Sequence, residues 1–157
     1  MSKIRYEIDL TRETVGIPNP EDRVRPVIAD DAFQLASLML DAYRDTIDYD
    51  DESLDDAIAE IDSYLHKRHP LLDMSRVGVE DDEIVAGVLL SASDEGPFVD
   101  YVMTRASHKG RGLGALVTRH ALAALAADGH PKVVFYITEG NEPSERLFSS
   151  LGAEATG

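Results

Sequence analysis

Cysteine is absent from the 157 residues, which excludes a disulfide framework, a thiolate nucleophile and a thiolate metal site. No stretch reaches the apolar length of a membrane span, and the first residues, Met1 to Glu7, lack the apolar core of a signal peptide. These absences predict a cytoplasmic protein without a membrane partner. With 43% hydrophobic residues, the chain can form a single globular domain with a sizeable core.

Basic residues are scarce, since 15 Lys and Arg stand against 30 Asp and Glu and the formal net charge is -15. Such a chain repels the phosphates of nucleic acid, so we expect no nucleic-acid partner. Acidic residues are in turn missing between Asp100 and Asp128. The arginines and lysines of that interval are Arg105, Lys109, Arg111 and Arg119. An acidic protein that keeps acids out of one loop and one helix is expected to bind a polyanion there.

The same interval contains a glycine-rich turn, Lys109-Gly110-Arg111-Gly112-Leu113-Gly114-Ala115. The turn separates the apolar run Val99–Thr104 from a helical pattern that begins at Leu113. Its three glycines remove the Cβ atoms that would keep a ligand from the backbone, and they permit positive φ. The first amides of a helix have no intrahelical acceptor, and the helix dipole favours an anion beside them. The turn therefore predicts a phosphate site, and a tight turn with a solvated basic face is the alternative.

Hydrophobic periodicity predicts a mixed α/β chain. Strands are expected at Ile4–Leu10, Arg23–Ile28, Ser75–Glu80, Ile84–Ser93, Phe98–Thr104 and Val133–Ile137. Helices are expected from Asp31 to Tyr43 after an Asp30 N-cap, from Leu54 to a point before Pro70, from Leu113 to Gly129, and from Glu142 to Leu151. The residues Gly16–Pro20 predict an extended loop.

A βαβ unit links Phe98–Thr104 to Val133–Ile137 through a helix, so these two strands should be parallel, with a right-handed crossover. The pair His66 and His69 has no third ligand at a suitable spacing, so we expect no metal site.

Two segments resemble motifs of the GCN5-related N-acetyltransferase (GNAT) family. The loop Lys109–Gly114 resembles the family's Gln/Arg-x-x-Gly-x-Gly/Ala motif, with the lysine in the first place. The segment Asn141–Ala153 resembles the family's Asn-x-x-Ala-x-x-Leu-Tyr-x-x-x-Gly-Phe helix. The joint spacing of the motifs around the βαβ unit and the order of the elements fit the family over roughly Arg23 to Ala153.

The resemblance implies one GNAT-like domain over residues 1–157, with an extra strand and loop at 1–22 and an acetyltransferase core at 23–153. The implied fold class is α/β (α+β). Its sheet would be mixed, mostly antiparallel and twisted, with helices on both faces. The central βαβ unit would be splayed around the coenzyme A site.

The implied activity is transfer of an acetyl group from acetyl-CoA to a primary amine, which is either a small cationic amine or a peptide amine. On this resemblance, the glycine loop holds the pyrophosphate, one strand edge pairs with the pantetheine arm, and the last helix lines the other side. The implied cofactor-binding residues are Val102, Met103, Thr104, Lys109, Gly110, Arg111, Gly112, Leu113, Gly114, Ala115, Asn141, Ser144 and Phe148.

Direct attack of a neutral amine on a thioester requires a base for the ammonium proton and a donor for the oxyanion. Asp100, Glu139 and Glu80 are candidate bases, because they lie on or next to strands that face the expected cleft. The backbone N–H of Met103 or Thr104 is the expected oxyanion donor.

Two features depart from the family. Phe148 stands where the family often has a tyrosine as general acid, so that role is absent or moves to Tyr136, Ser144 or water. The family's last two strands are expected to be missing, because only five residues follow Gly152. The strand Ile4–Leu10, from the same chain or from the partner in a homodimer, would then cover the exposed edge of the last predicted strand.

Acidic residues gather around the connection between the first two predicted helices. They are Asp41, Asp45, Asp48, Asp50, Asp51, Glu52, Asp55 and Asp56. By resemblance this region borders the acceptor site, where it would attract a polyamine, an aminoglycoside or a basic peptide. The alternative is that these acids only maintain solubility.

Two other functions remain open. A dinucleotide-binding module is one, because Gly110-x-Gly112-x-x-Ala115 also fits the Rossmann fingerprint and Glu139 ends the next strand. A non-catalytic acyl-CoA-binding regulatory protein is the other, and Phe148 and the short C-terminus favour it.

Overall fold

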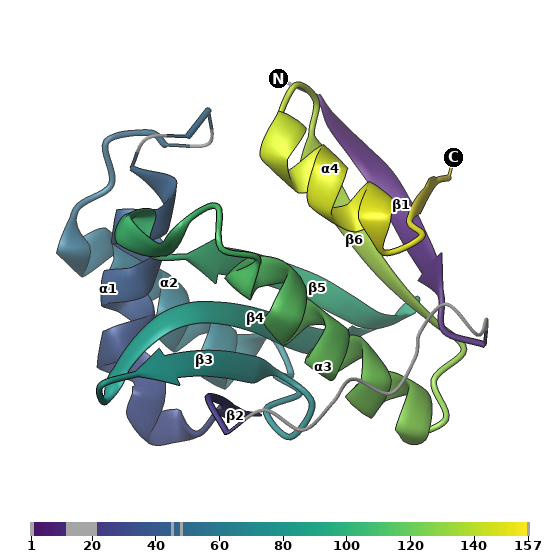
Figure 1. The fold of residues 1–157 in the computed structure, drawn as a ribbon, viewed down its shortest axis with the longest axis horizontal. Coiled ribbons are helices and arrows are strands. Elements are labelled where there is room, and N and C mark those ends of the chain that lie inside the picture. Colours follow the sequence, from purple (N-terminus) through teal and green to yellow (C-terminus); the bar gives the residue numbers. More distant parts are fainter. Residues whose placement is uncertain (1, 12–21, 45, 48, 157) are drawn as a thin grey trace.

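The computed structural model describes residues 2–11, 22–44, 46–47 and 49–156, which form a seven-stranded sheet flanked by helices (Figure 1). The strands are β1 (Lys3–Asp9), β2 (Val24–Pro26), β3 (Arg76–Glu80), β4 (Glu83–Ser93), β5 (Gly96–Thr104), β6 (Lys132–Thr138) and β7 (Glu154–Ala155). The helices are α1 (Ala32–Tyr43), α2 (Leu54–Lys67), α3 (Leu113–Ala127) and α4 (Glu142–Ser150), with 3-10 turns η1 (Ala29–Asp31) and η2 (Ala106–His108). The loop expected at Gly16–Pro20 lies outside the described residues.

The sheet has the strand order β2-β3-β4-β5-β6-β1-β7. Neighbouring strands are antiparallel except for β5 and β6, which are parallel, as the βαβ pattern predicts. These two strands share the register pair Phe98 and Val134 near their beginnings and then diverge (Figure 1). The sheet is therefore open between the C-terminal halves of β5 and β6.

A β-bulge in β5 contributes to this divergence. Tyr101 pairs with Leu89 on β4 and Val99 pairs with Leu90, so that Asp100 is the extra residue between them. A bulge bends the strand that carries it and increases its local twist. The chain thus turns β5 away from β6 at the position of a carboxylate.

Helices cover both faces of the sheet, as expected, and β4 shows the consequence. Its side chains Ile84 and Leu89 belong to the core formed with α1 and α2, whereas Val85, Val88 and Leu90 belong to the core formed with α3 and α4. A strand that is covered on both faces is apolar throughout, which explains its continuous hydrophobic run.

Strand β1 covers the outer edge of β6. The two strands are antiparallel, and Tyr6 stacks on Phe135 with ring centroids 5.7 Å apart. This confirms that Ile4–Leu10 protects the edge of β6, and the protecting strand belongs to the same chain. The two-residue strand β7 pairs with the outer edge of β1 and was not expected, because so short a segment carries no periodic pattern.

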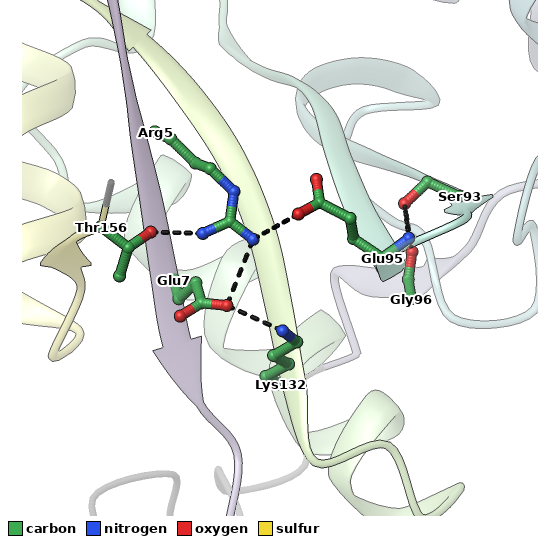
Figure 2. Close-up of polar contacts among 7 residues, drawn as sticks. All are labelled: Arg5, Glu7, Ser93, Glu95, Gly96, Lys132 and Thr156. Carbon is green, nitrogen blue, oxygen red and sulfur yellow. Dashed lines mark hydrogen bonds and ion pairs between the residues drawn. The ribbon is translucent and has the colours of Figure 1, made fainter.

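A polar cluster ties together the end of the sheet at which β5 and β6 meet (Figure 2). The guanidinium of Arg5 donates to Thr156 Oγ1, to Glu7 at 3.3 Å and to Glu95 at 2.7 Å. Lys132 on β6 donates to the same Glu7 oxygen at 2.9 Å. The contacts link β1 and β6 to the C-terminal tail and to the β4–β5 turn, so this end of the sheet is closed while the other end is open.

The start of α1 differs from the prediction. Its N-cap position is Asp31, not Asp30, and a 3-10 turn precedes it. Asp31 Oδ2 accepts from the Ile28 N–H at 2.9 Å, and the carboxylate accepts two bonds from Arg25 at 2.8 and 2.9 Å. Asp31 makes no capping hydrogen bond to α1; its carboxylate instead closes η1 on Ile28 and pairs with Arg25 of β2.

Candidate active site

A cavity of about 750 Å³ lies where β5 and β6 diverge. Residues 99–102 of β5 and 135–138 of β6 form one wall, and the beginning of α4 adjoins it. The opposite wall comes from α1, α2 and the loop between them. The cavity therefore joins the strand edges of the βαβ unit to the acidic region before α2.

The glycine loop leads from η2 into α3 through two left-handed residues. Gly110 and Gly112 have φ of 84° and 76°, a region that glycine enters without strain. The first hydrogen bond of α3 runs from the Leu116 N–H to the Gly112 carbonyl at 2.9 Å. The N–H groups of residues 110–115 donate no hydrogen bond within the described part of the chain. These amides are therefore available to an anion at the start of α3.

The side chains of the loop have distinct surroundings. Lys109 Nζ donates to a backbone carbonyl in the last turn of α1 at 2.8 Å, so it anchors the loop. Arg111 is exposed and has no ionic partner among the described residues. Leu113 is buried in the core. A Cβ on Gly114 would lie 3.2 Å from Thr104 Oγ1, so glycine lets the first turn of α3 pack directly against β5.

The free edge of β5 is defined by hydrogen-bond alternation. The Arg105 N–H donates to the Val85 carbonyl of β4 at 2.8 Å. Because backbone groups alternate along an antiparallel pair, those of Met103 also point to β4, whereas those of Val102 and Thr104 point away from it, toward β6. The Met103 side chain is buried against α1 and α2. Of the three predicted residues, only Val102 and Thr104 therefore present backbone groups to the opening, and the Val102 carbonyl accepts the Tyr43 hydroxyl there at 3.2 Å.

The other wall comes from α4 and β6. The Ser144 N–H donates to Asn141 Oδ1 at 3.3 Å, which caps α4, and both residues line the cavity. The Phe148 ring packs at a centroid distance of 4.1 Å from Phe135, and it is 4% exposed. Phe148 is thus a core residue with one edge at the cavity, as its apolar character suggests.

Asp100 is the candidate base that the structure places most deeply in the cavity wall. Its side chain is 7% exposed, and Oδ2 has no hydrogen-bond partner among the described residues. Oδ1 lies 3.8 Å from the Arg68 guanidinium. Burial raises the pKa of Asp100 above its usual value, although a Ser91 hydrogen bond and the charge of Arg68 oppose the shift.

The other candidate acid–base residues are not brought together with Asp100 to the same degree. Tyr136 lines the cavity and is 46% exposed. Glu139 is exposed beyond the end of β6 and does not line the cavity. Glu80 lies on β3, where it pairs with His108 at 2.7 Å. The structure thus groups Asp100 and Tyr136 and separates Glu139 and Glu80 from them.

A polar network beside Asp100 was missed by the sequence analysis. Glu60 of α2 accepts hydrogen bonds from Arg68 and from the Tyr101 hydroxyl. Burial opposes ionisation of Glu60, but these two bonds outweigh it and lower its pKa. Arg68 also donates to the Tyr101 hydroxyl at 2.8 Å. The one available signal was helical spacing, since Glu60 lies four residues after Asp56 on the same face of α2.

Only some of the acidic residues around the connection between α1 and α2 line the cavity. Glu52 and Asp56 line the cavity. Asp41 instead accepts the Ala106 N–H at 2.7 Å and holds η2. Asp45 and Asp48 lie outside the described residues. The remaining acids of the region, Asp50, Asp51 and Asp55, do not line the cavity.

The family model described as the acetyltransferase (GNAT) family matches residues 33–153. This chain therefore belongs to the acetyltransferase (GNAT) family, which confirms the resemblance of the glycine loop and the last helix. None of the curated proteins compared with the sequence matches it. Among the described residues, no helix has both the length and the hydrophobicity needed to cross a membrane.

Solved structures share the fold at low sequence identity. The GCN5-related N-acetyltransferase from Sphaerobacter thermophilus has a TM-score of 0.73 at 16% identity, with 98% of this chain and 48% of that chain covered. Diaminobutyrate acetyltransferase EctA from Paenibacillus lautus, in complex with L-2,4-diaminobutyric acid and coenzyme A, has a TM-score of 0.60 at 21% identity, covering 80% and 71%. PaiA N-acetyltransferase from Thermoplasma acidophilum, in complex with coenzyme A, has a TM-score of 0.64 at 12% identity, covering 80% and 85%. This chain thus spans about half of the Sphaerobacter protein.

Proposed function

We propose that this protein transfers an acetyl group from acetyl-CoA to a primary amine, as one acyltransferase unit with its core at residues 23–153. The supporting observation is that the start of α3, which follows the glycine loop, contacts the free edge of β5. The N–H groups of residues 110–115 donate no hydrogen bond among the described residues, and they lead into α3, whose Gly114 packs against Val102 and Thr104 on the free edge of β5. Family membership and the coenzyme A complexes of EctA and PaiA support acetyl-CoA as the co-substrate.

The residues present fit this co-substrate. A diphosphate requires several N–H donors, which the start of α3 offers together with the exposed Arg111. The pantetheine arm carries amides, which can pair with the backbone groups of Val102 and Thr104. Asn141 and Ser144 would form the opposite wall. When bound, acetyl-CoA supplies a reactive acyl thioester.

Transfer joins the amine nitrogen to the acetyl carbon and breaks the carbon–sulfur bond, so a proton leaves nitrogen and another reaches sulfur. Asp100 is our proposed acceptor of the first proton, because its raised pKa makes it a stronger base than an exposed carboxylate. Val102 or Thr104 would donate an N–H to the acyl oxygen. Phe148 cannot supply a proton to sulfur, and Tyr136, which lines the same cavity, is our proposed donor.

The dinucleotide-binding alternative requires a parallel, doubly wound sheet. Here β5 and β6 form the parallel pair, and the other neighbouring strands of the described sheet are antiparallel. Glu139, the expected ribose ligand, is exposed after β6. The geometry therefore favours the acyltransferase. A non-catalytic acyl-CoA-binding regulatory protein would have the same site but would not release CoA thiol, and an experiment can measure that difference.

The test measures free thiol released from acetyl-CoA in the presence of a panel of primary amines, with each acetylated product identified by mass. Asp100→Asn should lower kcat about 100-fold or more, the usual contribution of a positioned base, and leave acetyl-CoA binding unchanged. Asp94→Asn, an exposed acid of the β4–β5 turn, is the matched control and should keep full activity. Stabilisation by acetyl-CoA without thiol release from any amine would favour the regulatory alternative. Stabilisation by NAD but not by acetyl-CoA would contradict both the acetyltransferase proposal and the acyl-CoA-binding regulatory alternative.

A further inference from the structure

The cavity wall formed by α2 and β5 is negatively charged. The segment before α2 and its first two turns contribute Glu52, Asp56 and Glu60, and the bulge of β5 contributes Asp100. Within the described chain, Lys3 is the one cationic side chain in the lining, and it belongs to β1, which is paired with β6. A cavity with this distribution of charge attracts cations and repels carboxylates.

Asp100 distinguishes this wall from an ordinary acidic surface. Its side chain is more than nine-tenths buried, it lines the cavity, and its Oδ2 has no donor in the described structure. The nearest cation, Arg68, is shared with Glu60. A buried oxygen without a hydrogen bond is unfavourable, and an N–H donor from a bound cation would satisfy it.

A second anionic position lies at the start of α2. Glu60 is already neutralised by its bonds with Arg68 and Tyr101, so its charge is not available to a ligand. Glu52 and Asp56 have no cationic partner among the described residues: Glu52 accepts the Asp50 N–H, and Asp56 accepts hydrogen bonds from Ser53. Asp56 precedes Glu60 by one helical turn, which is about 6 Å along the axis. The cavity lining thus presents two anionic positions, Asp100 on β5 and the pair Glu52 and Asp56 at the start of α2.

Building on the proposed acetyl transfer, we propose that the acceptor is an aliphatic diamine or polyamine without a carboxylate. The nitrogen to be acetylated donates to Asp100 Oδ2, and a second ammonium group pairs with Glu52 and Asp56. Amino acids are disfavoured, because the carboxylates of α2 and β5 repel theirs and the lining cation, Lys3, lies on β1, outside the wall that α2 and β5 form. Chain length would be limited by a cavity of about 750 Å³ that also holds the acyl donor.

The first experiment compares matched small amines with the full-length wild-type protein. The probes are 1,4-diaminobutane, spermidine, 1-aminobutane and 2,4-diaminobutanoic acid, and the readouts are calorimetric binding and thiol release from acetyl-CoA. We expect 1,4-diaminobutane to bind at least about tenfold more tightly than 1-aminobutane and to have a correspondingly higher kcat/KM. The amino acid should be weaker than the diamine, since its carboxylate meets the acidic wall.

The second experiment locates the second ammonium site. The variant Glu52→Gln with Asp56→Asn should lose the advantage of the diamine over 1-aminobutane. Asn at position 56 retains an oxygen for the Ser53 N–H that closes the capping box of α2. Asp51→Asn with Asp55→Asn removes the same charge from exposed neighbours outside the cavity, and this control should keep the advantage.

The outcomes separate the two proposals. Equal binding and equal turnover of the diamine and the monoamine would overturn the substrate assignment and leave the acetyltransferase proposal intact. Selective binding of the diamine without thiol release would support the recognition site and count against acetyl transfer. If the double variant fails to fold, the comparison of the four amines on the wild-type protein still decides.

Discussion

Replacing Asp100 with asparagine should stabilise the fold at neutral pH. The carboxylate sits at a bulge, is almost fully buried and has one oxygen without a partner among the described residues. Asparagine has nearly the same shape and no charge. The variant therefore removes the unfavourable burial of a charge without opening a cavity.

The expected size of the effect follows from opposing contributions. A buried polar group without a partner costs about 1–3 kcal/mol. The attraction of Arg68, 3.8 Å from Oδ1, offsets part of that cost, and the asparagine amide brings unmet hydrogen bonds of its own. We therefore expect the free energy of unfolding to rise by about 1 kcal/mol, or about 2–4 °C in Tm for a domain of this size.

The stability gained by Asp100→Asn should increase with pH. Burial raises the pKa of Asp100 in the folded protein, whereas the unfolded chain has the ordinary value of 3.8. Below that value the carboxyl is neutral in both states, so burial of its charge no longer contributes to the difference between the two proteins. As the pH rises from 3.8 to the raised pKa, the unfolded chain loses its proton before the native protein does, so the variant becomes relatively more stable, and above the raised pKa the difference stays constant.

Urea unfolding of both proteins between pH 3.5 and pH 8, at about half-unit intervals, measures this difference directly. Asp94→Asn, which changes an exposed acid in the adjacent turn, should show no comparable trend. A constant difference across this range, or a variant less stable than wild type at pH 8, would refute the inference that burial of the Asp100 charge is unfavourable.

Other changes test the loop, the α1 cap and the sheet edge. Arg111→Glu should weaken acetyl-CoA binding about tenfold or more in calorimetry with an unchanged Tm, whereas Arg119→Glu, on the exposed face of α3, should have a much smaller effect. Gly112→Ala should lower the unfolding free energy by about 1 kcal/mol, because an L-residue is strained at φ of 76°. Asp31→Asn should lower the free energy of unfolding in urea by about 1–3 kcal/mol at neutral pH. Burial raises the pKa of Asp31, but the hydrogen bonds from Arg25 and Ile28 outweigh it and lower the pKa. The stability that Asp31 contributes is therefore present above pH 3.8 and lost as the pH falls through the lower native pKa. Deleting residues 1–9 should lower both solubility and Tm by exposing the edge of β6.

The parts of the fold that could be predicted are those with local causes. Helix α3 follows a glycine loop and has a continuous apolar face, and α4 begins at an asparagine cap followed by proline. The β3–β4 hairpin turns at Asp81 and Asp82, both of which adopt positive φ. In each case, residues within one turn or one strand determine the conformation, so the pattern in the sequence is sufficient.

The parts that could not be predicted depend on partners distant in sequence. The network around Glu60 requires Tyr101 from β5, which is 41 residues away. Periodicity identifies an exposed face on α2, but it does not show that β5 brings a buried carboxylate to that face.

The bulge in β5 is a common local cause of two features, the opening of the sheet and the position of Asp100. An extra residue leaves one ladder position without a partner, bends the strand and directs its side chain out of the regular alternation. An uncharged residue at this position would be less costly to bury, so a carboxylate with an unsatisfied oxygen is a poor choice for stability alone. The missing donor is supplied if a cationic amine binds there. Asp100→Asn should therefore gain stability and lose amine affinity together, because both measurements depend on the same oxygen.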